Sequence, residues 1–198
     1  MDCAARIRAQ AWFDPAAIRE VICRTAEGPV HRLWEPLADK RRPATPYGAK
    51  FSLPYCIALV LVEGEARVEG FSEEKTRDLR ILAVADKVRY VVDPTLPYPQ
   101  RFTGHVRVVL ADGRVLEETQ EAPRGGPKWP LGPGELEAKF RANAARALPE
   151  GQVEQVLERL LNVAGESDVA HAAAALRDRK STRLNSSHSR ASRMPSSA

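Results

Sequence analysis

VRVVLADGRVLE, residues 106–117, is the stretch of sequence that decides the fold. Two runs rich in β-branched and other apolar residues flank Asp112-Gly113. An Asp-Gly pair between such runs is typical of a tight turn, because glycine adopts the positive φ that the turn requires. The stretch therefore predicts a β-hairpin, and with it an antiparallel pair of strands.

The segments on either side of the hairpin predict two more strands and about seven helices. Strands are expected at residues 18–24 and 88–92, and the segments do not alternate regularly between strand and helix. This order predicts an α+β fold, in which a small antiparallel sheet with the hairpin packs on helices. Helices are expected at residues 2–10, 31–38, 51–62, 72–87, 135–148, 152–162 and 168–176, with an exposed loop at 39–43.

The chain is predicted to divide into an α+β region (1–130), C-terminal helices (131–176) and a basic, serine-rich tail (177–198). The tail holds six basic residues and one acidic residue, so it accounts for the net charge of +4 over the whole chain. The nearly balanced charge of the remainder argues against a nucleic-acid partner, and nucleic-acid binding through the tail is the least favoured function. We expect the tail to be disordered. It resembles translated sequencing-adapter read-through and is not expected to be native.

Composition and motif content exclude several classes of protein. The chain is 43% hydrophobic and 28% charged, and it contains no apolar run long enough to cross a bilayer, so no membrane association is expected. Three widely spaced cysteines without a signal peptide predict reduced, buried thiols and a cytoplasmic location. Neither a metal nor an organic cofactor is expected, because the four histidines lack ligand spacing and no phosphate-binding loop is present. His105 is expected to be an ordinary sheet residue.

AKFSLPYCIALVLVEG, residues 49–64, is the segment with candidate chemistry. Because Pro54 is tolerated in the first turn of a helix, Lys50, Ser52 and Tyr55 are expected around one helix N-terminus. Unpaired N–H groups and the helix dipole favour an anion there, and a cation, a hydroxyl and a phenol would suit a carboxylate. The residue types alone favour another interpretation, a buried helix whose Tyr55 hydroxyl bonds within the core while Lys50 lies on the surface.

The same run resembles the corresponding segment of the MmgE/PrpD family, whose members include 2-methylcitrate dehydratase and cis-aconitate decarboxylase. A second similar segment lies downstream, in Gly126-Pro127, Pro130-Leu131 and ELEAKFRANA (135–144). The approach from Asp2 to the Thr45-Pro46 turn is also similar. The resemblance therefore covers most of residues 1–164.

The resemblance implies a cofactor-independent lyase or isomerase, similar to 2-methylcitrate dehydratase, that acts on a small di- or tricarboxylic acid. It also implies a homodimer in which a large helical domain and a smaller α+β lid enclose the active site. Tyr55 takes the position of the family's catalytic lid tyrosine, and Lys50 and Ser52 are the candidate substrate-binding residues. The other catalytic residues of the family would precede Met1, so we expect a C-terminal lid-domain portion that is inactive alone. The alternative is a non-catalytic carboxylate-binding or dimerisation module.

Overall fold

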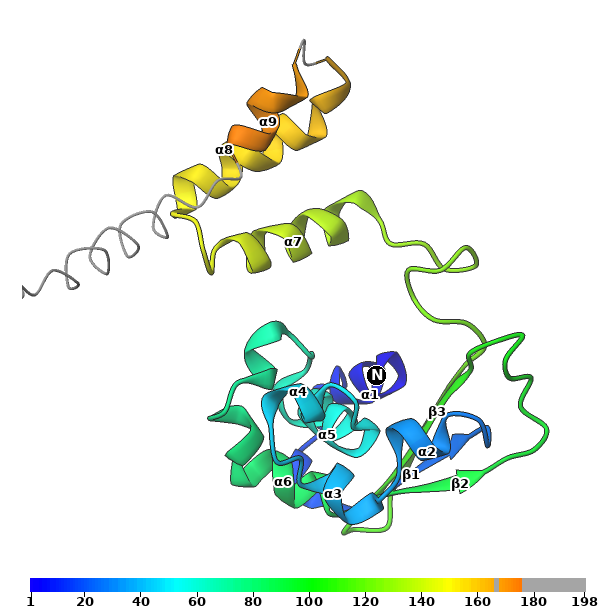
Figure 1. Cartoon of the computed structure of the whole chain (residues 1–198). Coiled ribbons are helices and arrows are strands. Elements are labelled where there is room, and N and C mark those ends of the chain that lie inside the picture. The colour runs from blue at the N-terminus through cyan, green and yellow to red at the C-terminus, as the bar shows by residue number, and fades with distance from the viewer. Residues whose placement is uncertain (166–167, 176–198) are drawn as a thin grey trace, which may run out of the picture. The chain divides into compact units, whose positions relative to one another are not determined.

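The computed structural model describes residues 1–165 and 168–175 of the 198-residue chain (Figure 1). The chain separates into two compact units, Met1–Pro130 and the part that begins at Leu131. The predicted tail, residues 177–198, lies outside the described residues.

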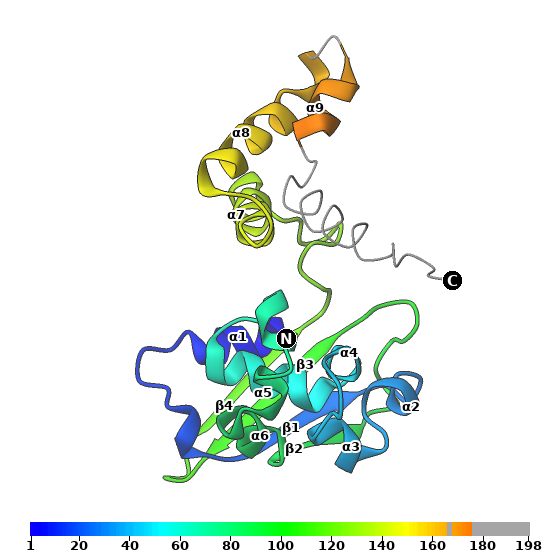
Figure 2. The ribbon, with the colours of Figure 1, turned by 60° about the vertical axis from the view of Figure 1, so that its left-hand side comes forward.

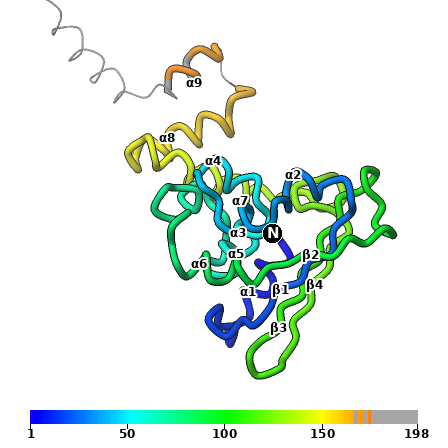
Figure 3. The backbone as a smooth tube through the Cα atoms, turned by 60° about the horizontal axis from the view of Figure 1, so that its bottom comes forward, coloured from blue at the N-terminus to red at the C-terminus, as the bar shows by residue number. Residues whose placement is uncertain are grey.

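A four-stranded sheet forms the centre of the first unit. Its strands are β1 (Ile18–Thr25), β2 (Val88–Val92), β3 (Gly104–Leu110) and β4 (Val115–Gln120). They lie in the order β2-β1-β3-β4, and Figure 3 labels all four strands. The predicted hairpin is confirmed, since β3 pairs antiparallel with β4 and Gly113 adopts a φ of 87° in the turn between them.

The α+β fold class is confirmed, but the sheet is mixed and not wholly antiparallel as expected. β1 pairs antiparallel with β3, from Ile18↔Leu110 to Ile22↔Arg107. In contrast, β1 pairs parallel with β2 over Val21↔Val88 to Thr25↔Val92. The helical connection between β1 and β2 returns the chain to the starting end of β1, which makes these two strands parallel.

Helices of the first unit differ from the predicted ones at two places. The helix expected at 31–38 is divided at Glu35-Pro36, and the loop expected at 39–43 is partly helical. Pro36 explains both differences, because proline lacks the N–H that would continue the first helix but is tolerated at the start of the next. The helix expected from Ser72 begins only at Leu79, where the Asp78 carboxylate accepts a hydrogen bond from the Arg80 N–H at 2.9 Å. The elements are α1 (Asp2–Arg8), η1 (Pro15–Ala17), α2 (Val30–Leu33), α3 (Leu37–Arg41), α4 (Pro46–Ala49), α5 (Leu53–Glu63), η2 (Val68–Phe71), η3 (Lys75–Arg77) and α6 (Leu79–Ala85).

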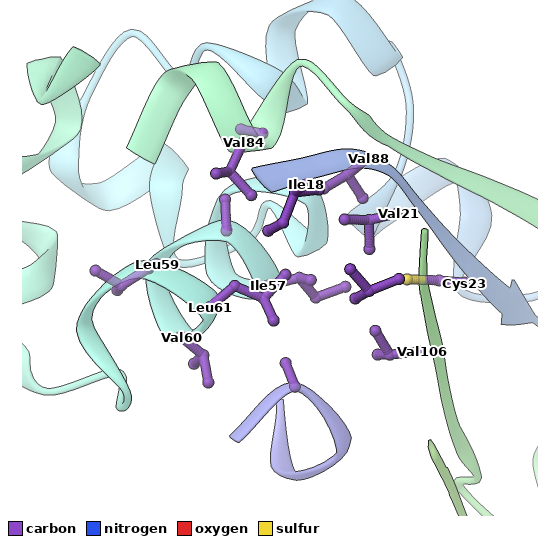
Figure 4. Packing of buried hydrophobic residues seen from close by; sticks show 14 of the residues in the cluster. Ile18, Val21, Cys23, Ile57, Leu59, Val60, Leu61, Val84, Val88 and Val106 are labelled. Atoms are coloured by element: carbon purple, nitrogen blue, oxygen red, sulfur yellow. The ribbon is translucent and has the colours of Figure 1, made fainter. Parts of the chain in front are cut away.

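Helix α5 is the centre of the hydrophobic core. It is apolar around its whole circumference and packs against α1, α6 and the sheet (Figure 2). Ile57 and Leu61 belong to the same buried cluster as strand residues such as Ile18 and Val106 (Figure 4). The three cysteines, Cys3, Cys23 and Cys56, are buried and free, as expected.

Arginine side chains bind main-chain carbonyls on both edge strands of the sheet. Arg41 donates from Nε and Nη2 to the carbonyl of Val88 in β2, at 3.0 and 2.7 Å. Arg6 donates from Nη2 to the carbonyl of Thr119 in β4 at 3.0 Å, and its Nε is 2.8 Å from a carboxylate oxygen of Glu118. Each edge therefore has a guanidinium group bonded to its backbone.

The second unit is helical. Its helices are α7 (Pro133–Ala144), α8 (Glu150–Leu161) and α9 (Val169–Ala175), with a 3-10 turn, η4 (Val163–Gly165). Val153, Val156 and Leu157 form the buried face of α8. Arg141 joins α7 to α8 through two hydrogen bonds to the Glu154 carboxylate, at 2.8 and 3.1 Å.

Candidate functional site

The N-terminus of α5 is where the sequence-predicted site residues meet. Ser52 is the N-cap, since its Oγ accepts a hydrogen bond from the Tyr55 N–H at 3.1 Å. Pro54 lies in the first turn, as predicted, and Gly64 ends the helix with a φ of 91°. Only glycine adopts that backbone conformation without strain, which explains why the helix ends there.

Ser52 uses its hydroxyl group as both donor and acceptor within the fold. In addition to capping α5, the hydroxyl donates to the carbonyl of Lys40 in α3, and the residue is buried. The Tyr55 N–H is already bonded, and Pro54 has no N–H to offer. The expected anion cradle at this helix start therefore has few free donors, and the described geometry gives Ser52 a structural role.

Lys50 is exposed at the end of α4 and forms no ion pair with any residue that the structure describes. The neighbouring Lys40 differs, because its Nζ donates to the carbonyls of Arg32 and Phe51 at 2.7 and 2.8 Å. Lys50 is thus a cation near the start of α5 that is available to a ligand.

Tyr55 is completely buried beneath η2. Its hydroxyl donates a hydrogen bond to the carbonyl of Gly70 at 2.7 Å, and its ring lies 6.2 Å from that of Phe71. Burial raises the pKa of the Tyr55 phenol to about 12, which disfavours the phenolate at neutral pH. These are the contacts of a core residue, as in the interpretation that residue types alone favour. Contact with a substrate would require the hydroxyl to leave Gly70.

A polar cluster around His105 was not found by sequence reasoning. His105 Nδ1 accepts a hydrogen bond from the Arg24 N–H at 3.1 Å, and Nε2 lies 2.7 Å from Glu117 Oε1. The Arg24 guanidinium lies 3.7 Å from the Asp93 carboxylate and 3.9 Å from that of Glu117. The hairpin pairing contained the signal, because it places His105 opposite Thr119 and hence diagonal to Glu117.

Residues 1–165 and 168–175 contain neither a cluster of metal ligands nor a helix that could span a membrane. Within these ranges, no three or more His, Cys, Asp or Glu side chains gather as they would around a metal ion. None of the helices in the same ranges combines the length and the apolar character needed to span a bilayer.

Comparison with known proteins identifies the family. The family model of the MmgE/PrpD C-terminal domain matches residues 1–163, which include the start of α5 and the whole sheet. This chain belongs to the MmgE/PrpD family. The resemblance inferred from residues 49–64 and 126–144 is thereby confirmed.

Three MmgE/PrpD relatives are similar to this chain at low identity. Human cis-aconitate decarboxylase is 27% identical over 122 residues, which cover 61% of this chain and 25% of that protein. The mitochondrial 2-methylcitrate dehydratase of Yarrowia lipolytica is 26% identical over 136 residues, which cover 61% of this chain and 25% of that enzyme. The 2-methylcitrate dehydratase of Cupriavidus necator is 30% identical over 141 residues, or 65% of this chain and 28% of that enzyme. The chain thus spans about a quarter of the length of these relatives.

Proposed function

We propose that this chain forms the C-terminal domain of a lyase that acts on a small di- or tricarboxylic acid, as 2-methylcitrate dehydratase does. The observation that carries the proposal is the match of the MmgE/PrpD C-terminal domain over residues 1–163. The similar dehydratases and decarboxylase all eliminate a group from a small carboxylic acid, as their names state. The homodimer and the cytoplasmic location stay predictions.

In the proposed reaction, the chain supplies binding and proton-donating groups while a base from elsewhere in the enzyme removes the carbon-bound proton. Lys50 is the proposed partner of a substrate carboxylate, because it is exposed and forms no ion pair with a described residue. Tyr55 is the proposed donor to the departing or developing anion. For this role its hydroxyl must exchange the Gly70 carbonyl for the substrate. The proposed chemistry uses neither a metal nor an organic cofactor.

A chimeric enzyme tests this function. Residues 1–163 replace the matching part of the Cupriavidus necator dehydratase, and turnover of 2-methylcitrate is followed by the ultraviolet absorbance of the unsaturated product. We expect the chimera to be active. The 198-residue chain alone should turn over neither 2-methylcitrate nor cis-aconitate, because a phenol and an ammonium group do not remove a carbon-bound proton. Turnover by the isolated chain that depends on Tyr55 would contradict this division of labour.

Lys50→Gln in the active chimera tests the binding role. Loss of one charge-assisted contact should raise KM roughly tenfold and change kcat little. Lys128→Gln, which removes another exposed lysine, is the matched control. A folded chimera that binds citrate in calorimetry but turns over no substrate would instead favour the non-catalytic carboxylate-binding module.

A further inference from the structure

His105 connects three strands of the sheet through one imidazole ring. The ring extends from β3, accepts a hydrogen bond from the Arg24 N–H of β1 at Nδ1, and contacts Glu117 of β4 through Nε2. Its side chain is only 7% exposed. Because Nδ1 accepts a hydrogen bond, the single ring hydrogen of the neutral form is on Nε2, which donates to Glu117.

The ring occupies the end of the antiparallel ladder between β1 and β3. Regular pairing extends to Ile22↔Arg107, and two residues further along β1 the Arg24 N–H meets the ring nitrogen. On its other side, Arg24 pairs with Val91 in β2. The Asp93 N–H donates to the carbonyl of Thr25 at 2.9 Å, at the point where the chain leaves β2.

Charged groups on β1, β3 and β4, and one just after β2, lie near this ring or near its partner Glu117. They are Arg24 from β1, Asp93 at the end of β2, Arg107 from β3 and Glu117 from β4. The hydrogen bond with His105 holds the pKa of Glu117 below its usual value. Hydrogen bonds from Thr95 do the same for the pKa of Asp93. Both carboxylates therefore stay ionised in mild acid, whereas histidine is the residue type whose charge ordinarily changes between pH 5 and pH 8.

We propose that His105 is an acid-sensitive latch, in which the neutral ring holds both β1 and β4 and the protonated ring holds β4 alone. An imidazolium ion carries hydrogen on both nitrogens, so its Nδ1–H would face the Arg24 N–H and cannot accept from it. The hydrogen bond to the Glu117 carboxylate gains an ion-pair attraction and persists. Protonation thus loosens the end of β1. It also loosens the segment that begins at Asp93, because that segment is bonded to the end of β1. The proposal rests on the geometry of the sheet and is independent of the proposed lyase activity.

Nuclear magnetic resonance of the ¹⁵N-labelled full-length chain tests the latch. The ring nitrogen shifts of His105 report its protonation, and amide hydrogen exchange of Arg24, corrected for the intrinsic rate, reports the bond to Nδ1. Between about pH 8 and pH 5, we expect Arg24 protection to fall roughly tenfold, in step with protonation of the ring. Protection that stays constant while the ring titrates would overturn the proposal.

Three variants sharpen the test. His105→Asn places an amide oxygen near the position of Nδ1 and cannot be protonated, so Arg24 should keep its protection at both pH values. Glu117→Gln keeps an acceptor for Nε2–H but removes the charge, and it should move the loss of protection to lower pH. His31→Gln, which removes an exposed histidine of α2, should change nothing. If His105→Asn does not fold, Glu117→Gln decides the matter, because an unchanged midpoint contradicts the latch.

Discussion

The Tyr55 hydroxyl donates a hydrogen bond to the main-chain carbonyl of Gly70, 2.7 Å away. One turn further along α5, Leu59 faces the same glycine, and a Cβ at Gly70 would lie only 2.5 Å from Leu59 Cδ2. Helix α5 therefore contacts η2 in two ways, through a hydroxyl that bonds to its backbone and an isobutyl group that leaves no space for a side chain. Close docking of η2 on α5 depends on both.

Tyr55→Phe should lower the free energy of unfolding of the chain by about 1–3 kcal/mol, because it leaves the buried Gly70 carbonyl without its partner. Urea denaturation measures this loss. Tyr47→Phe is the matched control, since Tyr47 is 70% exposed and its hydroxyl bonds to no residue of the described chain. Equal stability of the two variants would contradict the structural role of the hydroxyl.

The same Tyr55→Phe substitution in the chimeric dehydratase tests the proposed catalytic role. Loss of a positioned proton donor should lower kcat on the order of 10²-fold, measured below the melting temperature of the variant. Near-normal turnover together with lowered stability would assign Tyr55 to the core alone. The proposed lyase activity would stand in that case, because the unsubstituted chimera tests it.

Gly70→Ala should destabilise the chain by about 1–3 kcal/mol through overpacking against Leu59. Combining it with Leu59→Ala should cost less than the sum of the two single changes, because the smaller side chain makes space for the new methyl group. Gly151→Ala in α8 is the control, since a Cβ there meets no atom within 4 Å. That change should be neutral or stabilising by about 0.5 kcal/mol in thermal unfolding.

Ser52→Ala should lower the free energy of unfolding by about 1–2 kcal/mol, because it removes both the cap of α5 and the hydrogen bond to the Lys40 carbonyl. The melting temperature reports the loss. Thr45→Ala removes a similar cap from the four-residue helix α4. It should lower the free energy of unfolding by less, because the Gly48 N–H that loses its partner lies near solvent. A larger effect at Thr45 than at Ser52 would contradict the importance of the α5 cap.

Asp78→Asn should make the chain less sensitive to acid. Hydrogen bonds from the Arg80 side chain lower the pKa of the Asp78 carboxyl in the folded state. A carboxyl with a lowered folded pKa stabilises the fold above its ordinary value and loses that contribution as pH falls through the folded value. The urea concentration at which half of the parent protein is unfolded should therefore decrease as the pH is lowered from about 5 to about 2.

The Asp78→Asn variant should show a shallower fall in that midpoint, because asparagine keeps a capping oxygen but has no charge to lose. Asp39→Asn, at an exposed aspartate of α3 without an ion pair among the described residues, serves as the control. It should follow the parent.

Local signals account for the parts of the fold that the sequence predicts. The Asp112-Gly113 turn predicts the hairpin, and Pro54 and Gly64 mark the two ends of α5, because these residues restrict or permit particular backbone angles within a few positions. The parallel pairing of β1 with β2 has no comparable signal. It depends on the path of the intervening helices, and pairing between distant segments is a property of the whole fold.

For the candidate site too, the sequence predicts the local arrangement but not the contacts with distant residues. Lys50, Ser52 and Tyr55 are neighbours in sequence, so their gathering at one helix start follows from a single local motif. The direction of each side chain depends on distant partners. Gly70 binds the Tyr55 hydroxyl within the core, and no pattern around residue 55 specifies that contact. The His105 cluster likewise depends on the register of β3 with β4 and on the position of Arg24.

The arginines at the two edges of the sheet have a consequence for association between molecules. An open edge strand can pair with a strand of another chain, and repeated pairing of this kind builds fibrils. The guanidinium groups of Arg41 and Arg6 already bond to the Val88 and Thr119 carbonyls, where an incoming strand would need an acceptor. Crowded copies of this unit are thereby hindered from polymerising through their sheets.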